Sequence, residues 1–286
     1  MTYENFEAIR VAVDAGVATV TLDNPPVNVE DAKLVRDLTR FARTVATDSS
    51  VQVIVYQSAN PDFFAAHADN GWMFDPSGLM ALADPDGDPG LNPLQQLHER
   101  LRTLPQVTIA KLRGRLRAGG AELAMTADMR FAAAGETWLS QPESLMGIFP
   151  GGGGTQYLNR LVGRARGLEI ALSGELYDSA TAERYGWINR EIAPQYLDAW
   201  VSTIARRIAA LPTGVATAAK EAFDAAEASG PVPDLREEAK AHGKVYPSPP
   251  SVVARVRVLM DHGGQQPIGE IDLEGTLRSI PWPAAE

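Results

Sequence analysis

The chain contains no cysteine, which removes one group of chemistries at once. Disulfide bonds, thiolate nucleophiles and thiolate metal sites are excluded, so any catalytic side chain must act through oxygen or nitrogen. The histidines are few and scattered, and no two of them have the i, i+4 spacing of a helical metal site. We therefore expect no protein-bound metal. The four histidines are His67, His98, His242 and His262.

Clusters of positive charge and long apolar runs are also missing. The formal net charge is −10 and no basic block stands out, which argues against binding to nucleic acid or to an anionic membrane surface. No uninterrupted apolar stretch reaches the ~20 residues of a membrane span, and the first residues lack the basic and then apolar layout of a signal peptide. We expect a cytoplasmic protein with neither nucleic acid nor membrane as a partner.

Two common enzyme motifs are absent as well. No serine lies in a G-x-S-x-G elbow, and the Gly-rich PGGGGTQ lacks the Lys-Ser/Thr ending of a phosphate-binding P-loop. What the sequence does have is length and apolar content. Its 286 residues, 45% of them hydrophobic, suffice for one large domain with a sizeable core, alone or with an appendage.

The first third of the chain predicts strands and helices in alternation. Residues 7–23 alternate apolar and polar positions around Asp-Ala-Gly, which predicts a hairpin. Residues 30–47 carry apolar side chains at spacings of three and four, which predicts a helix. The β-branched stretches 51–58 and 107–114 predict strands. Between them, residues 75–93 are rich in Asp, Pro and Gly and predict a mobile surface loop, which could also cover a binding site.

The alternation continues downstream and then stops. Residues 129–134 predict a strand, 153–163 a helix, and 164–189 two short helices around a Gly-Glu turn. Such alternation is typical of an α/β fold with largely parallel pairing. From about residue 194 the pattern is only helical, so we predict an α/β core over 1–195 and a helical region over 196–286.

Two glutamates stand in unusual surroundings. Glu122 follows Gly119-Gly120 in RAGGAELAM, and these glycines are expected to open a helix, whose first turn has free N–H groups that attract oxyanions. Glu143 follows a proline in QPESLMGIFPGGGG. Taken singly, Glu122 could merely complement the helix dipole and Glu143 could be an exposed turn residue. Together, carboxylates on neighbouring loops can divide the roles of acid and base.

The sequence resembles the crotonase (enoyl-CoA hydratase/isomerase) superfamily in four ordered stretches, and the resemblance covers most of residues 5 to 210. The combination of Gly-Gly-x-Glu, Gln-Pro-Glu and Pro-Gly-x-Gly-Gly-Thr-Gln makes it specific. It implies a spiral of β-β-α units followed by a helical region that forms homotrimers, often stacked as hexamers. The four stretches are FFAAHAD (63–69), RGRLRAGGAELAMTADMRFAA (113–133), QPESLMGIFPGGGGTQYLNRLVG (141–163) and GELYDSATAERYGWINR (174–190).

The resemblance also implies a reaction. The family's two glutamates would be Glu122 and Glu143, and the backbone N–H groups of Ala68 and Gly119 would bind a thioester carbonyl oxygen and stabilise an enolate. For an enoyl-CoA hydratase, Glu122 would activate water and Glu143 would deliver or remove the proton at the α carbon. No cofactor is implied, because coenzyme A forms part of the acyl-CoA substrate.

The chain departs from the family pattern at two places. His67 stands where the family usually has Gly, so it either points into the fold or lines the pocket as a third acid/base group, with an ordinary pKa of about 6.5. The segments DNPPVNVED and NGWM lack the cations with which many relatives bind the CoA phosphates. Arg255 or Arg257 could supply that charge, unless both lie on a solvated helix face.

The acyl pocket itself can only be outlined. Trp72, Met73 and Phe74 could form its roof, although such a cluster is as often ordinary core packing. The final stretch, 264–286, carries no role that the sequence reveals. The predicted pocket residues are His67, Asp69, Gly120, Trp72 and Met73.

Three functions remain open. Hydratase chemistry is favoured because both glutamates are present. A family member without CoA specificity, such as a β-diketone carbon–carbon hydrolase that recruits His67, or an enoyl-CoA isomerase, is the second. A catalytically silent assembly subunit is the third, and the retained pair of glutamates speaks against it.

Overall fold

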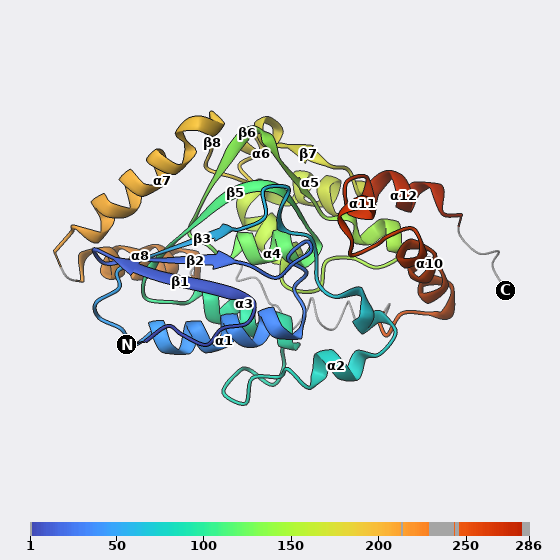
Figure 1. Cartoon of the computed structure of the whole chain (residues 1–286), viewed down its shortest axis with the longest axis horizontal. Coiled ribbons are helices and arrows are strands. Elements are labelled where there is room, and N and C mark those ends of the chain that lie inside the picture. Colours follow the sequence, from blue (N-terminus) through green and yellow to red (C-terminus); the bar gives the residue numbers. More distant parts are fainter. Residues whose placement is uncertain (1, 213, 229–242, 244–245, 282–286) are drawn as a thin grey trace.

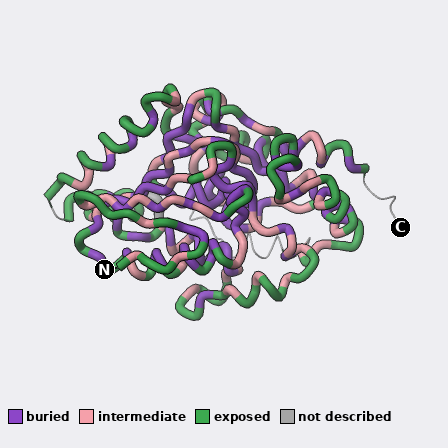
Figure 2. The backbone as a smooth tube through the Cα atoms, viewed as in Figure 1, coloured by how far each residue is buried: buried purple, intermediate pink, exposed green. Residues whose placement is uncertain are grey.

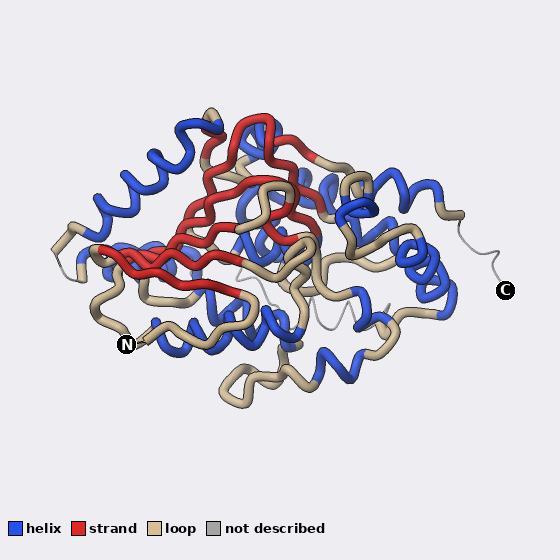
Figure 3. Tube along the Cα trace, viewed as in Figure 1, coloured by secondary structure: helices blue, strands red, loops and turns tan. Residues whose placement is uncertain are grey.

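A computed structural model describes residues 2–212, 214–228, 243 and 246–281 of the chain. The described chain forms one mixed sheet of eight strands with helices around it (Figure 1, Figure 3). In Figure 1 helix α7 lies at one end of the long axis, and α10 to α12 lie at the other. The C-terminal region is thus divided between the two ends of the α/β core.

The sheet has the strand order β1-β2-β3-β5-β6-β7, with β4 added on β5 and β8 on β6. The pairs β1–β2 and β6–β7 are antiparallel, and the other pairs are parallel. The strands are β1 (Ile9–Asp14), β2 (Val17–Leu22), β3 (Val53–Ser58), β4 (Phe63–Ala65), β5 (Val107–Arg117), β6 (Met129–Ser140), β7 (Tyr177–Asp178) and β8 (Arg190–Ile192).

The two longest strands, β5 and β6, each pair with three other strands. On one side, β5 pairs with β3 through residues 107–110 and then with β4 through 115–116. Its register with β6 shifts between Leu112 and Gly114. Because β4 and β5 are parallel neighbours, their carboxyl ends meet at one edge of the sheet. The segments that follow them, 66–69 and 118–122, therefore lie together.

Both faces of the sheet are covered by helices. On β3, Val53 and Val55 pack against α7, whereas Ile54 and Tyr56 face the larger core with α1, α3 and α4. Figure 2 shows this buried centre inside an exposed shell. The helices are α1 (Ala32–Val45), α2 (Pro76–Met80), α3 (Pro93–Arg102), α4 (Ala118–Met125), α5 (Gly154–Ser173), α6 (Ser179–Tyr185), α7 (Pro194–Ala209), α8 (Val215–Ala228), α10 (Pro250–Asp261), α11 (Pro267–Glu270) and α12 (Leu273–Ser279), with short 3-10 helices η1 (Asn70–Met73) and η2 (Pro142–Met146).

The strongest sequence patterns are confirmed. The hairpin pairs Asp14 with Val17 across Ala15-Gly16, whose positive φ angles of 47° and 79° make the tight turn. Helix α1 begins after Asp31, whose side chain accepts hydrogen bonds from the first N–H groups of the helix. Gly163, with φ 76°, interrupts α5 where the predicted helix 153–163 ends.

The weaker predictions needed correction. The strands predicted at 107–114 and 129–134 are longer, and the short strands β4, β7 and β8 were missed, because two or three residues carry too little pattern to predict a strand. The stretch 75–93 begins with helix α2 and is not only a loop. It is fastened by the buried Asp84, which pairs with both Arg43 and Arg100.

The C-terminal region packs on the core in two separate places. Helix α7 covers β3, β5 and β6, whereas α10 and α12 form a separate apolar cluster with Met146 of η2. The division of the chain at residue 195 remains a prediction. In the described part of the chain, no helix is long and apolar enough to cross a membrane.

The close contact between α4 and β4 predicts an intolerant glycine. A Cβ on Gly120 would lie 2.2 Å from the carbonyl oxygen of Ala65, a backbone atom that cannot easily move. We expect Gly120→Ala to lower the free energy of unfolding by about 1 to 3 kcal/mol in denaturant titrations, as overpacking does. Gly78→Ala is the control, since its added Cβ would meet only ordinary contacts at 3.4 Å. Equal stability of the two variants would contradict this packing.

Candidate active site

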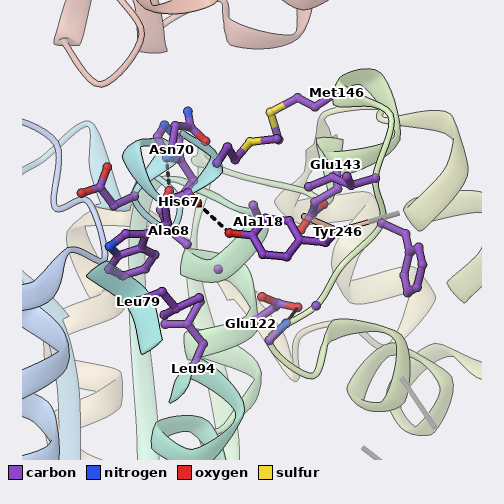
Figure 4. A pocket seen from close by; sticks show the side chains of 18 of the residues that line it. His67, Ala68, Asn70, Leu79, Leu94, Ala118, Glu122, Glu143, Met146 and Tyr246 are labelled. Atoms are coloured by element: carbon purple, nitrogen blue, oxygen red, sulfur yellow. Dashed lines mark hydrogen bonds between the residues drawn. The ribbon is translucent and has the colours of Figure 1, made fainter. Parts of the chain in front are cut away.

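A cavity of about 280 Å³ lies where β4 and β5 end (Figure 4). Its walls combine the start of α4, the 3-10 helices η1 and η2, the Gly-rich segment before α5, and residues of the C-terminal region. The lining is mostly apolar. Among the described residues, neither Lys nor Arg lines it, and no group of three or more His, Asp or Glu side chains gathers as a metal site.

The start of α4 presents a main-chain donor to this cavity. Gly119 is the second residue of the helix, so its N–H has no acceptor within the helix. A Cβ on Gly119 would lie 2.7 Å from Oε2 of Glu30 and 3.0 Å from the backbone nitrogen of Ala68. Only glycine fits this position, and the close approach places the main chains of Gly119 and Ala68 side by side.

The segment after β4 supplies a second donor. Glu30 donates its backbone N–H to the carbonyl of His67 at 2.8 Å and accepts from the N–H of Asp69 at 3.2 Å. Successive N–H groups of an extended chain point to opposite sides, so the N–H of Ala68 is directed away from residue 30. Ala68 and Gly119 both line the cavity. Two adjacent main-chain donors of this kind can hold a developing oxyanion.

Glu122 is held by the Gly-rich segment. Its Oε1 accepts hydrogen bonds from the N–H groups of Gly152 at 2.9 Å and Gly154 at 2.8 Å. A Cβ on either glycine would lie 2.5 to 2.7 Å from the carboxylate oxygens. The run of glycines therefore binds the Glu122 carboxylate through its main-chain N–H groups and leaves no room for a side chain at Gly152 or Gly154.

Glu143 enters the same cavity from a different element. It lies on η2, at the end of β6, and is 5% exposed. With its amide nitrogen turned toward Glu143, Gln141 donates to both carboxylate oxygens, at 2.8 Å to Oε1 and 3.0 Å to Oε2. Figure 4 shows Glu122 and Glu143 approaching from separate segments. The site thus combines two buried carboxylates with two main-chain donors.

Behind Glu122 lies a fully buried pair, His98 and Glu30. The Nδ1 of His98 is 2.7 Å from the carbonyl oxygen of Gly152, and its Nε2 is 2.9 Å from Oε1 of Glu30. A carbonyl and a carboxylate both accept, so both ring nitrogens carry protons. Burial lowers the pKa of His98, but the charge and hydrogen bond of Glu30, together with the charge of Glu122, raise it to about 9. His98 is therefore a cation that fixes Gly152 beneath Glu122.

His67 forms a second pair of the same kind. Its Nδ1 is 2.8 Å from the carbonyl oxygen of Ala68, and its Nε2 is 2.8 Å from Oε1 of Glu270. Burial lowers the pKa of His67, but the charge and hydrogen bond of Glu270 raise it by more, so that the net shift of the pKa is upward. The ring borders the cavity, but both nitrogens are engaged. This arrangement supports a structural role for His67 over that of a third acid/base group.

Comparison with known proteins agrees with this geometry. The family described as "Enoyl-CoA hydratase/isomerase" matches residues 12–248. The chain belongs to the enoyl-CoA hydratase/isomerase family. It is thus an enzyme by family, and the fold implied by the crotonase resemblance is confirmed.

Three proteins of known name are similar to this enoyl-CoA hydratase/isomerase family member. A "probable enoyl-CoA hydratase" of Rhizobium meliloti is 33% identical over 77% of the chain and 82% of the relative. Another of that name, from Bacillus subtilis, is 37% identical over 59% of the chain and 62% of the relative. A solved structure named "putative enoyl-CoA hydratase", from Streptomyces avermitilis, is 45% identical over 96% of this chain and 99% of its own, with a TM-score of 0.89.

The structure brings most of the predicted site residues of this family member to one place. Gly120 does not line the cavity and packs against the backbone of β4 instead. The stretch 75–93 contributes Leu79, Met80 and Asn92, so part of it lines the cavity. The predicted residues that line the cavity are His67, Ala68, Asp69, Trp72, Met73, Gly119, Glu122 and Glu143.

The predicted role of Arg255 in binding phosphate is not supported. Its side chain is 4% exposed and donates to the carbonyl oxygens of Leu145, at 2.8 Å, and of Leu277 and Ile280. It is neither solvated nor available for a ligand. Arg257 is exposed, with its guanidinium carbon 5.7 Å from the centre of the Phe74 ring.

Several site residues were missed by sequence reasoning. Glu30, Glu270 and Tyr246 carried no motif, although the Tyr246 hydroxyl donates to the carbonyl of Trp72 at 2.6 Å and its ring lines the cavity (Figure 4). His98 did carry a signal. It lies four residues after Leu94, on the apolar face of α3, where a histidine needs a buried partner.

The His98–Glu30 pair predicts how stability depends on pH. Because the pKa of His98 is higher in the folded state than in the unfolded chain, its protonation stabilises the folded state. This contribution is fully present below about pH 6.5 and is lost as pH rises through about 9. We expect His98→Gln to lack this part of the wild-type decline, on the order of 3 kcal/mol, in denaturant titrations from pH 6 to 9.5. His262→Gln, at an exposed position, is the control and should keep the wild-type slope. Parallel curves for wild type and His98→Gln would contradict a protonated His98.

Proposed function

We propose that this protein adds water across the double bond of a 2-enoyl-CoA thioester. The single observation that carries the proposal is that Glu122 and Glu143 line one cavity together with Ala68 and Gly119. This set contains two groups able to exchange protons and two main-chain donors able to bind the thioester oxygen. Relatives that bear the name enoyl-CoA hydratase support the same reaction.

The proposed mechanism divides the work between the two carboxylates. The N–H groups of Ala68 and Gly119 bind the thioester oxygen and stabilise the charge of an enolate as it forms. Glu122 takes a proton from water, whose oxygen bonds to the β carbon while the double-bond electrons move toward the carbonyl. Glu143 delivers a proton to the α carbon as the enolate collapses to the thioester. The proton now on Glu122 returns to Glu143 through solvent, so the enzyme is regenerated.

The apolar walls of the cavity favour an apolar acyl group. Trp72, Leu94 and Met146 line it from three parts of the core, and Leu259 and Leu273 from the C-terminal region. A cavity of about 280 Å³ suits the acyl and thioester end of the substrate, with the nucleotide of CoA outside it. No cofactor is part of this proposal, because CoA arrives as part of the substrate.

The alternative functions find less support in the geometry. A carbon–carbon hydrolase that recruits His67 would need a free ring nitrogen, and both nitrogens are hydrogen-bonded. A silent subunit would have no use for two buried carboxylates facing one cavity. Assembly into homotrimers stays a prediction, and exposed apolar side chains such as Tyr196 and Phe223 on α7 and α8 are candidates for the subunit contacts.

The two carboxylates provide the direct test of this function. We expect Glu122→Gln and Glu143→Gln each to lower kcat for hydration of a short 2-enoyl-CoA by about 10²–10⁴-fold, as loss of acid/base catalysis does. The loss of absorbance of the conjugated thioester measures the rate. Glu136→Gln, a surface change in the Arg113 ion pair, should leave kcat unchanged. Activity of both site variants within threefold of wild type would contradict the acid/base roles of Glu122 and Glu143.

Arg257 provides a test of CoA recognition. Because it is exposed beside Phe74, the residue that follows Met73 of the cavity wall, we propose that it meets a CoA phosphate. We expect Arg257→Ala to raise KM two- to fivefold without changing kcat, the size of effect that one exposed charge pair gives. With an acyl-pantetheine thioester, which has no nucleotide phosphates, the same variant should match wild type. An equal rise in KM for both substrates would show that Arg257 acts through packing.

A further inference from the structure

Buried charged side chains connect the C-terminal segment 265–280 to residues close in sequence to Ala68 and Gly119. Glu270, on α11, is fully buried, and its Oε1 lies 2.8 Å from Nε2 of His67. Glu274, on α12, accepts from Nε of Arg117 at 2.7 Å and from its Nη2 at 3.2 Å. In Figure 1 these two short helices lie beside the core at the end opposite α7.

The two partners of these glutamates, His67 and Arg117, each lie close in sequence to one of the two main-chain donors. His67 directly precedes Ala68, and its Nδ1 also binds the Ala68 carbonyl. Arg117 is the last residue of β5 and precedes Ala118, whose φ of 46° lies in the left-handed region, and Gly119. A strained backbone of this kind persists only where its surroundings hold it. One segment therefore contacts the residues beside both donors.

The charges of this cluster are balanced, and hydrogen bonds link its members. With His67 as a cation, two positive and two negative side chains face one another, all at most 4% exposed. Arg117 also donates Nη2 to the carbonyl of Glu270 at 2.9 Å, and Gln265 donates its N–H to Oε1 of Glu270 at 2.6 Å. The Gln265 amide reaches Asp69 at 2.9 Å, on the other side of Ala68. Removing one member of such a set leaves a buried charge unpaired.

We propose that Glu270 and Glu274 are positioning residues that hold the two halves of the oxyanion hole at their working distance. This inference rests on the proposed function, because it assigns the cavity donors to a thioester oxygen. Neither carboxylate lines the cavity. They act through His67 and Arg117 on the main chains of Ala68 and Gly119, where a displacement of 1 Å can cost about 10²-fold in rate.

The kinetic test separates positioning from simple docking of the C-terminal segment. We expect Glu270→Gln and Glu274→Gln to lower kcat for 2-enoyl-CoA hydration 10- to 100-fold, with KM within threefold of wild type. Arg278→Gln is the matched control, because the exposed Arg278 fastens the same segment through contacts to Glu175 at 3.0 Å and the Gly174 carbonyl at 3.2 Å. It should keep kcat within twofold. Wild-type kcat in both glutamate variants, or an equal loss of kcat in Arg278→Gln, would overturn the proposal.

Two further measurements keep the test decisive. In a double-mutant cycle, His67→Asn combined with Glu270→Gln should be no slower than the slower single variant, because Glu270 acts through His67. Additive losses would contradict that route. If a single charge change prevents folding, Arg117→Met with Glu274→Met removes both charges at once. This double variant should fold and still lose kcat at least tenfold, and full activity would overturn the proposal.

Amide hydrogen exchange of the ligand-free protein separates this inference from the hydratase assignment. We expect faster exchange in peptides covering residues 66–69 for Glu270→Gln and 117–121 for Glu274→Gln, and in neither for Arg278→Gln. If wild type fails to hydrate any 2-enoyl-CoA, the proposed function fails, and the inference then stands or falls on this exchange pattern. Unchanged exchange in both peptides would overturn it whatever the activity.

Discussion

The main-chain pairing of residue 30 with residues 67 and 69 is the contact on which the rest of the site depends. It holds the segment after β4 in an extended form and turns the N–H of Ala68 toward the cavity side. The side chain of the same residue, Glu30, binds His98, which fixes Gly152, and Gly152 in turn donates to Glu122. One residue thus links the proposed oxyanion donor Ala68 to Glu122, the carboxylate proposed to activate water. Gly119 completes the arrangement, because any side chain there would meet Glu30 and Ala68.

Charge balance in the interior is the second constraint. His98 faces Glu30, His67 faces Glu270, and Arg117 faces Glu274, so each of these three cations beside the cavity has a buried carboxylate at hydrogen-bond distance. Buried ion pairs are a weak source of net stability, since desolvation offsets much of their attraction. What they supply is a fixed arrangement of the side chains, because breaking one pair leaves a buried charge without its partner. Their location around Ala68, Gly119 and Glu122 therefore supports a role in holding these proposed site groups in place.

Local sequence patterns predicted the parts of the fold that local physics determines. The Asp-Ala-Gly hairpin, the apolar face of α1, the helix start at the Gly119-Gly120 pair and the break at Gly163 all follow from a few neighbouring residues. Contacts between distant residues could not be predicted in this way. His98 and Glu30 are 68 positions apart, and His67 and Glu270 are 203 apart. The fully packed Arg255, which we expected to be solvated or to bind phosphate, shows the same limit, because its carbonyl partners come from η2 and the chain beyond α10.

The central claim is that Ala68 and Gly119 bind a thioester oxygen between the two glutamates. A crystal structure of the Glu122→Gln variant soaked with a 2-enoyl-CoA tests it most directly, because a slowed enzyme retains its substrate. The account predicts the thioester oxygen at about 2.7–3.1 Å from both backbone nitrogens, with the α carbon facing Glu143. An acyl-CoA bound with its carbonyl away from both nitrogens, or outside this cavity, would contradict it.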